Sequence, residues 1–192
     1  MTSLDLTDAA SAMSDLLTGV SDDQLGGRTP CPGLAVGDLV SHVHGLSQAF
    51  AAAAVKDLGP MTATPPTDGI PPLDPDWRAT VGGHLSRLAA AWQAPDAWTG
   101  MTMAGGVDLP GEVAGLVAVD ELVVHGWDIA RSTGRPFDPG ETALQGAHAF
   151  LVESRKGPVP ADLFGPEVPV PDGAPLFDRV VGLAGRDPGW TP

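Results

Sequence analysis

Apolar residues recur at helical spacing in six stretches of the chain. Residues at i, i+3, i+4 and i+7 share one face of an α-helix, so such a run can bury one side against a core. The pattern predicts helices over Leu4–Val20, Val36–Val55, Asp76–Ala94, Pro110–Thr133, Glu141–Arg155 and Leu176–Ala184. We therefore expect an all-α fold in one domain over residues 1–192, a four-helix bundle with long crossover loops and a short extra C-terminal helix.

The segments between the predicted helices are rich in proline and glycine. Lys56–Asp76 contains six prolines and is a poor candidate for regular structure. Loops of this length are often functional, so we expect it to cross one end of the bundle, as a lid or a mobile segment. Val159–Pro175 is also proline-rich. Trp98–Leu109 carries Gly105–Gly106 between two short runs, which predicts a small hairpin or an extended loop.

The helix predicted over Pro110–Thr133 carries polar residues within an apolar surface. On a 3.6-residue period one stripe contains Ala114, Ala118, Glu121, His125, Asp128 and Ser132, and the neighbouring stripes are rich in Val, Leu and Ile. Burying such polar groups without partners costs roughly 2–7 kcal/mol each. A bound metal ion is the simplest way to compensate them, because Glu121 and His125 lie four residues apart and can reach one ion.

His42 is the candidate third ligand. It shares a helix face with Leu39 and Leu46, whereas His44 lies roughly 200° further round. We therefore expect His42, and not His44, to face the core. Two imidazoles and one carboxylate leave coordination positions open, as catalytic zinc sites do, and the same donors suit iron or nickel. Asp128 could bind the ion weakly or orient an imidazole.

Other interpretations of these residues remain open. A Glu-x-x-x-His pair also occurs by chance on helix surfaces, and a lone core histidine is often simply hydrogen-bonded. His84 and His148 show no imidazole or acidic partner in the pattern and are expected to be surface or packing residues. Cys31, between two prolines, could be a reactive thiol or a small buried residue. Trp127 could pack in the core or line a pocket.

The chain is strongly acidic, with 24 Asp and Glu against 10 Lys and Arg and a formal net charge of −14. Phosphate backbones and anionic membranes would repel it, so we expect neither a nucleic-acid nor a membrane partner. No apolar run reaches transmembrane length, and acidic residues interrupt the first 21 positions, where a secretory signal would be apolar. The single cysteine allows no internal disulfide. A cytoplasmic protein, monomeric or homodimeric, is expected.

Four short motifs, in order, resemble the DinB-like metal-binding superfamily. They are Thr29-Pro-Cys-Pro-Gly33, Val36-Gly-Asp-Leu-Val-Ser-His-Val-His-Gly45, Asp120-Glu-Leu-Val-Val-His-Gly-Trp-Asp-Ile-Ala130, and Phe164-Gly-Pro-Glu-Val-Pro-Val-Pro171 with Gly185-Arg-Asp-Pro-Gly-Trp190. Within that superfamily the chain is most similar to the branch related to the N-terminal domain of mycothiol-dependent maleylpyruvate isomerase. The chain departs from the usual pattern at Leu34, where the family often has tryptophan, and at Gly37, where it often has a basic residue.

The resemblance implies a DinB-like bundle that holds a divalent metal, commonly zinc, with His42, Glu121 and His125 at the family's ligand positions. It also implies an enzyme that activates a low-molecular-weight thiol such as mycothiol and transfers it to a small electrophile, or isomerises that substrate. In such a mechanism the nucleophile is a metal-bound thiolate, so no catalytic side chain is required and Asp128 has a supporting role. The alternatives are a metal-dependent hydrolase or tailoring enzyme, in which bound water reacts, and a non-catalytic metal-binding stress protein.

Overall fold

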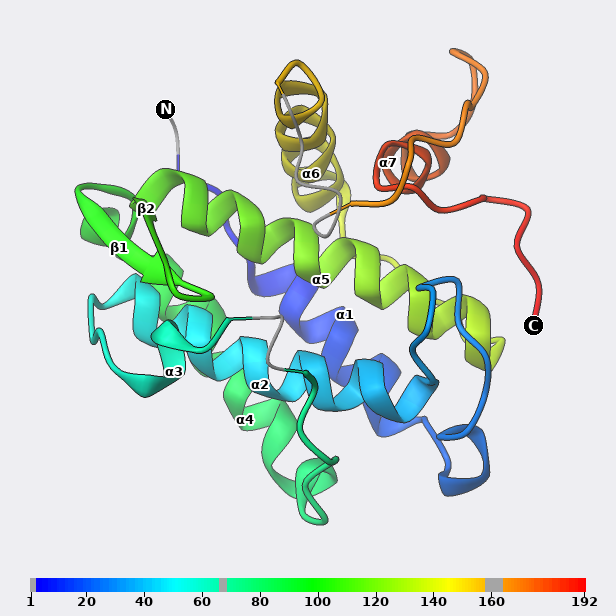
Figure 1. The fold of residues 1–192 in the computed structure, drawn as a ribbon, viewed down its shortest axis with the longest axis horizontal. Coiled ribbons are helices and arrows are strands. Elements are labelled where there is room, and N and C mark those ends of the chain that lie inside the picture. The colour runs from blue at the N-terminus through cyan, green and yellow to red at the C-terminus, as the bar shows by residue number, and fades with distance from the viewer. Residues whose placement is uncertain (1–2, 66–68, 158–163) are drawn as a thin grey trace.

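A computed structural model of the protein describes residues 3–65, 69–157 and 164–192. The chain is mostly helical, with one small sheet among the described residues (Figure 1). In chain order the elements are α1 (Thr7–Thr18), η1 (Asp22–Gln24), α2 (Val36–Ala54), α3 (Pro60–Ala63), α4 (Trp77–Trp92), η3 (Pro95–Trp98), β1 (Met101–Ala104), β2 (Val107–Pro110), α5 (Gly111–Thr133), α6 (Glu141–Ser154) and α7 (Leu176–Leu183). The expected helical DinB-like fold is confirmed.

Four helices form the bundle. Helices α1 and α2 each pack against both α4 and α5, so the four elements close a ring around one core. Their apolar stripes supply that core as the spacing predicted: α1 buries Ala9, Ala10, Met13, Leu16 and Leu17, and α4 buries Trp77, Val81, Leu85, Leu88, Ala89 and Trp92. This arrangement places α2 beside α5, which carry all the candidate ligands (Figure 1).

Helix α5 is the longest element, and its 23 residues span about 35 Å at the usual helical rise. It begins after Pro110 and ends at Gly134, whose left-handed backbone (φ +68°) closes the helix. Neighbours approach its backbone closely at its first residue, Gly111, and at two glycines further along the helix. A Cβ on Gly115 would lie 2.5 Å from the Trp98 ring, and one on Gly126 would lie 2.1 Å from the Phe137 ring. The helix is therefore packed on several sides.

The Trp98–Leu109 stretch forms the hairpin, the first of the two predicted alternatives. Strand β1 pairs antiparallel with β2, and Ala104 lies opposite Val107 across the turn. The two turn residues, Gly105 and Gly106, both have positive φ, which glycine tolerates and tight hairpin turns require. The hairpin is attached to α2 by Thr102, whose hydroxyl donates to the Ala53 carbonyl at 2.6 Å.

The expectation that Lys56–Asp76 lacks regular structure is wrong for Pro60–Ala63, which form the short helix α3. Proline is compatible with the first turn of a helix because the N–H there has no partner within the helix. Further along this segment, the Ser41 hydroxyl of α2 donates to the Pro71 carbonyl at 2.7 Å. Residues 66–68 lie outside the described chain, and a lid function for this segment stays a prediction.

Helices α6 and α7 lie outside the bundle. Helix α6 packs against α5 and α7, on the side of α5 opposite α2 and α4 (Figure 1). Of the proline-rich stretch predicted before α7, residues 159–163 lie outside the described chain. After α7 the chain returns to α5, where the Arg131 guanidinium donates to the Trp190 carbonyl at 2.6 Å. Among the described residues, no helix is both long and apolar enough to cross a membrane.

Candidate metal centre

His42, Glu121 and His125 meet between α2 and α5. One carboxylate oxygen, Glu121 Oε2, lies 3.1 Å from His42 Nε2 and 3.1 Å from His125 Nε2. The donor atoms of the three residues all lie within 4.8 Å of one another. The side chains of His42 and Glu121 remain 29% and 26% exposed, and that of His125 12%. The structure thus brings together the three residues that the sequence predicted as ligands, in a site that is partly exposed to solvent.

These donors fit a divalent metal ion. Two imidazole nitrogens and one carboxylate oxygen are ligands that zinc, iron and nickel accept, and three protein ligands leave further positions open. The same three side chains also satisfy one another by hydrogen bonding, because Glu121 accepts from both histidines. A buried hydrogen-bonded group and a metal site are therefore both compatible with the geometry, and metal content distinguishes them.

The contacts shift the pKa values of the site in opposite directions. Burial alone would raise the pKa of Glu121, but hydrogen bonds from His125 and His42 outweigh it and hold that pKa below its ordinary range. Burial alone would lower the pKa of His125, but bonds to Asp128 and Glu121 raise it to about 9. Without a metal, Glu121 is therefore ionised and His125 is a cation with a proton on each ring nitrogen. To coordinate an ion through Nε2, His125 must release the proton there.

Asp128 supports His125 from behind. Its carboxylate is completely buried, and Oδ2 accepts from His125 Nδ1 at 3.1 Å and from Arg186 Nη2 at 3.0 Å. The other oxygen, Oδ1, accepts from Arg186 Nε at 3.3 Å. Burial would raise the pKa of Asp128, but the His125 hydrogen bond and the Arg186 charge lower it overall. Both oxygens are engaged, so this geometry suits an orienting role better than direct ligation.

Two residues of the site were not assigned a role from the sequence. Arg186 is 8% exposed and comes from the segment after α7, where helical periodicity says nothing about side-chain direction. Its only signal was its place in the Gly185–Trp190 motif. Asp120, next to Glu121, is 4% exposed and its Oδ1 atom is buried without a hydrogen-bond partner. Burial and the Glu121 charge raise the pKa of Asp120 to about 8, so it is mainly protonated at neutral pH.

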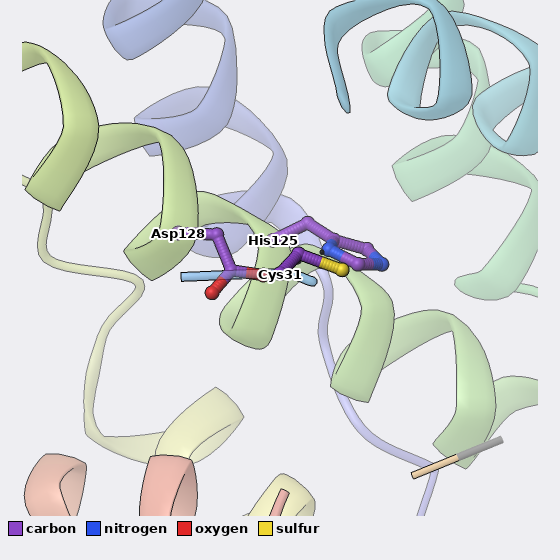
Figure 2. Close-up of side chains that lie close together, drawn as sticks. All are labelled: Cys31, His125 and Asp128. Atoms are coloured by element: carbon purple, nitrogen blue, oxygen red, sulfur yellow. Dashed lines mark hydrogen bonds and ion pairs between the residues drawn. The ribbon is translucent and has the colours of Figure 1, made fainter. Parts of the chain in front are cut away.

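Cys31 lies beside the same histidine (Figure 2). Its Sγ atom and the donor atoms of His125 and Asp128 lie within 4.8 Å of one another. Arg186 already occupies both oxygens of Asp128, and its positive charge disfavours a cation among these three side chains. Burial raises the pKa of the half-buried Cys31 thiol despite the nearby Arg186 charge. Cys31 therefore lines the site beside His125, and its side chain is mainly the protonated thiol.

His44 and His84 form a pair that the sequence did not predict, although His84 is the packing residue that was expected. Both are half-buried, and their rings pack together between α2 and α4 with centroids 4.7 Å apart. The Nε2 atom of His44 also lies 3.0 Å from the Thr80 hydroxyl. The pattern of one helix does not reveal a partner on another, which is why the pair was missed. His42 and His44 thus face α5 and α4, respectively.

The matched family is described as the mycothiol maleylpyruvate isomerase N-terminal domain, and the match covers residues 6–130. That range includes His42, Glu121, His125 and Asp128, and it ends before Arg186. Two uncharacterized proteins of Mycobacterium tuberculosis, from strains CDC 1551 / Oshkosh and ATCC 25618 / H37Rv, are each 32% identical over 93% of this chain and 93% of their own length.

Two solved structures share the fold. The crystal structure of the mycothiol-dependent maleylpyruvate isomerase matches with a TM-score of 0.54 and 22% identity, over 76% of this chain and 67% of that chain. A histidine-to-alanine mutant of the mycothiol-dependent maleylpyruvate isomerase matches with a TM-score of 0.52 and 20% identity, over 76% of this chain and 67% of that chain. The resemblance drawn from the four motifs is therefore confirmed, and the chain belongs to the mycothiol maleylpyruvate isomerase N-terminal domain family.

Proposed function

We propose that the protein is a metal-dependent enzyme that uses a mycothiol-type thiol on a small electrophilic substrate, by transfer or by isomerisation. Membership of the family supports the thiol. The observation that carries the proposal is the convergence of His42, Glu121 and His125 on one partly exposed point. A closed structural site would bury its donors, whereas His42 and Glu121 remain partly exposed to solvent.

His42, Glu121 and His125 would hold the ion, with zinc the first candidate and nickel or iron suited by the same donors. An ion there would supply positive charge that lowers the pKa of a thiol bound to it, so that the nucleophilic thiolate forms at neutral pH. Glu121 contributes the one negative charge among the three ligands. The two imidazoles must be neutral to donate their lone pairs, and on the His125 side the site has a device that sets which ring nitrogen then keeps its proton.

That device is the Asp128 carboxylate. It accepts from His125 Nδ1, which places the ring proton on Nδ1 and leaves Nε2 free to face Glu121 and His42. Arg186 keeps Asp128 ionised and fixes its plane through two hydrogen bonds. The raised pKa of the Cys31 thiol makes this side chain a poor nucleophile, in agreement with an external thiol as the reacting group.

Metal content tests the first part of the proposal. Protein purified without added metal, then reconstituted, should hold about one divalent ion per chain by mass spectrometry. His42→Ala and His125→Ala should each lose it. The matched controls are His44→Ala, two residues from His42 but facing α4, and His148→Ala, which should both retain it. A wild-type chain that holds no metal after reconstitution would refute the metal site and leave a hydrogen-bonded Glu121 cluster.

A thiol reaction tests the second part. Metal-loaded protein should accelerate the reaction of mycothiol with activated alkenes or epoxides, or the isomerisation of a conjugated alkene. The chelated protein and Glu121→Gln should not. A protein that holds the metal but gives no rate enhancement with mycothiol over the free thiol would refute the thiol-dependent activity while leaving the metal site intact.

A further inference from the structure

Arg186 reaches the candidate metal centre from outside the part of the chain that defines the family. The family match ends at residue 130, and Arg186 follows α7 near the end of the chain. Its guanidinium is nearly buried and makes two hydrogen bonds to Asp128. The position of Arg186 therefore depends on how the end of α7 is held against the rest of the molecule.

Arg155, just past the end of α6, holds that end. Its Nε atom donates to the Leu183 carbonyl at 2.9 Å, and its Nη2 atom donates to the carbonyls of Leu183 and Gly165. Leu183 is the last residue of α7, and carbonyls in the last turn of a helix lack partners within the helix. A cation at this end also complements the helix dipole. One guanidinium thus fixes both the end of α7 and the segment that precedes it.

The Leu183 carbonyl that Arg155 contacts is close to Arg186 along the chain. Only Ala184 and Gly185 lie between Leu183 and Arg186, a span of about 10 Å at most. The Arg186 backbone N–H donates to the Val181 carbonyl at 2.8 Å, and its Nη1 atom donates to the Ala184 carbonyl at 2.8 Å. Gly185 has φ +83°, and a Cβ there would lie 2.9 Å from the Gly165 backbone. Movement of the Leu183 and Gly165 carbonyls, which Arg155 holds, would therefore move Arg186.

We propose that Arg155 is a positioning residue for the candidate metal centre. It acts through the end of α7, which sets Arg186 on Asp128, and Asp128 in turn orients His125. The meaning for catalysis rests on the proposed function, whereas the placement of Arg186 can be measured in metal-free protein. Arg155 itself contacts none of the candidate ligands in the described part of the chain.

The test compares Arg155→Met with Arg78→Met. Arg78 is the matched control because it too donates to a backbone carbonyl, that of Val20 at 2.9 Å. It joins α4 to the chain just after α1, in another part of the fold. Thermal unfolding establishes that each variant is folded. The readout is the NMR signal of the Arg186 Nε–H, assigned by its loss in Arg186→Lys, in metal-free protein. A second readout is zinc affinity by competition with a chelator.

Arg155→Met should shift or broaden the Arg186 signal and weaken zinc binding by about tenfold, in the range seen when residues that support metal ligands are removed. Arg78→Met should change neither. If Arg155→Met does not fold, Arg155→Lys gives the same test, because a lysine lacks the planar fork that contacts both carbonyls. An unmoved Arg186 signal in a folded Arg155 variant would overturn the proposal. If the wild type binds no zinc, the proposed function fails, and the NMR signal still decides the role of Arg155.

Discussion

Two residues of separation along a helix send His42 and His44 to different neighbours. Successive residues turn by 100°, so side chains two apart point about 200° away from each other. His42 lies against Glu121 of α5, and His44 packs on His84 of α4. Helix α2 therefore separates two imidazole pairs with different surroundings. His42 and His125 lie beside carboxylates, whereas His44 and His84 lie near the Arg87 cation.

The second pair should make stability depend on pH. Burial lowers the pKa of His84, with help from His44 and Arg87 and against Asp74. The unfolded chain then binds a proton at His84 at a higher pH than the folded chain, so stability falls as the pH drops through the ordinary histidine value. His84→Gln should lose less stability than the wild type between pH 7.5 and 5.5, measured by urea unfolding. An equal or larger loss in the variant would contradict this assignment.

The candidate ligands could be predicted from the sequence because a stripe on one helix is a local pattern. Glu121 and His125 interrupt an apolar face, and His42 is the histidine on the inner face of its own helix. Arg186 and the partnership of His44 with His84 depend on how separate elements meet, which no local pattern contains. Asp120 looked like an ordinary acidic residue, and only its burial without a partner distinguishes it.

At the scale of elements, helix bounds followed the apolar spacing closely. Helix α5 was predicted over Pro110–Thr133 and is observed over Gly111–Thr133, and α6 was predicted one residue too long. The error at Pro60–Ala63 came from treating prolines as breakers, although one begins a helix there. Sequence could not choose between hairpin and loop at Trp98–Leu109, because two-residue glycine turns occur in both.

Close packing around α5 should make Gly115 important for the stability of the fold. In open helices, Gly→Ala stabilises by about 0.5–1 kcal/mol. A methyl group on Gly115 would meet the rings of Trp98 and Trp92 below 3 Å, so Gly115→Ala should instead destabilise by about 1–3 kcal/mol. Gly83 of α4 is the control, because it is exposed and nothing lies within 4 Å of its missing Cβ. Chemical denaturation of both variants gives the comparison, and a stabilising Gly115→Ala would contradict the packing.

At the scale of the whole molecule, the net charge of −14 sets a background of self-repulsion. The described chain has few exposed ion pairs that salt could weaken, among them Arg78–Asp22 and Lys156–Glu153. Raising ionic strength from 0.01 to 0.15 M shortens the screening length from about 30 to about 8 Å. The Tm of the metal-free protein should therefore rise with sodium chloride over this range, by calorimetry. A falling Tm would mean that attractive pairs outweigh the repulsion.

The return of the chain from α7 to Asp128 has a consequence for how the protein can be divided. A fragment cut where the family match ends would keep His42, Glu121 and His125 but lose the only guanidinium seen on Asp128 in the described chain. Such a fragment would carry a buried carboxylate without its counter-charge, which is costly. A fusion protein that contains this bundle should therefore also contain α6, α7 and the segment with Arg186. The same holds for a scaffold onto which the ligands are grafted. The site combines α2 and α5 with the segment after α7, and a domain boundary drawn from similarity alone would divide it.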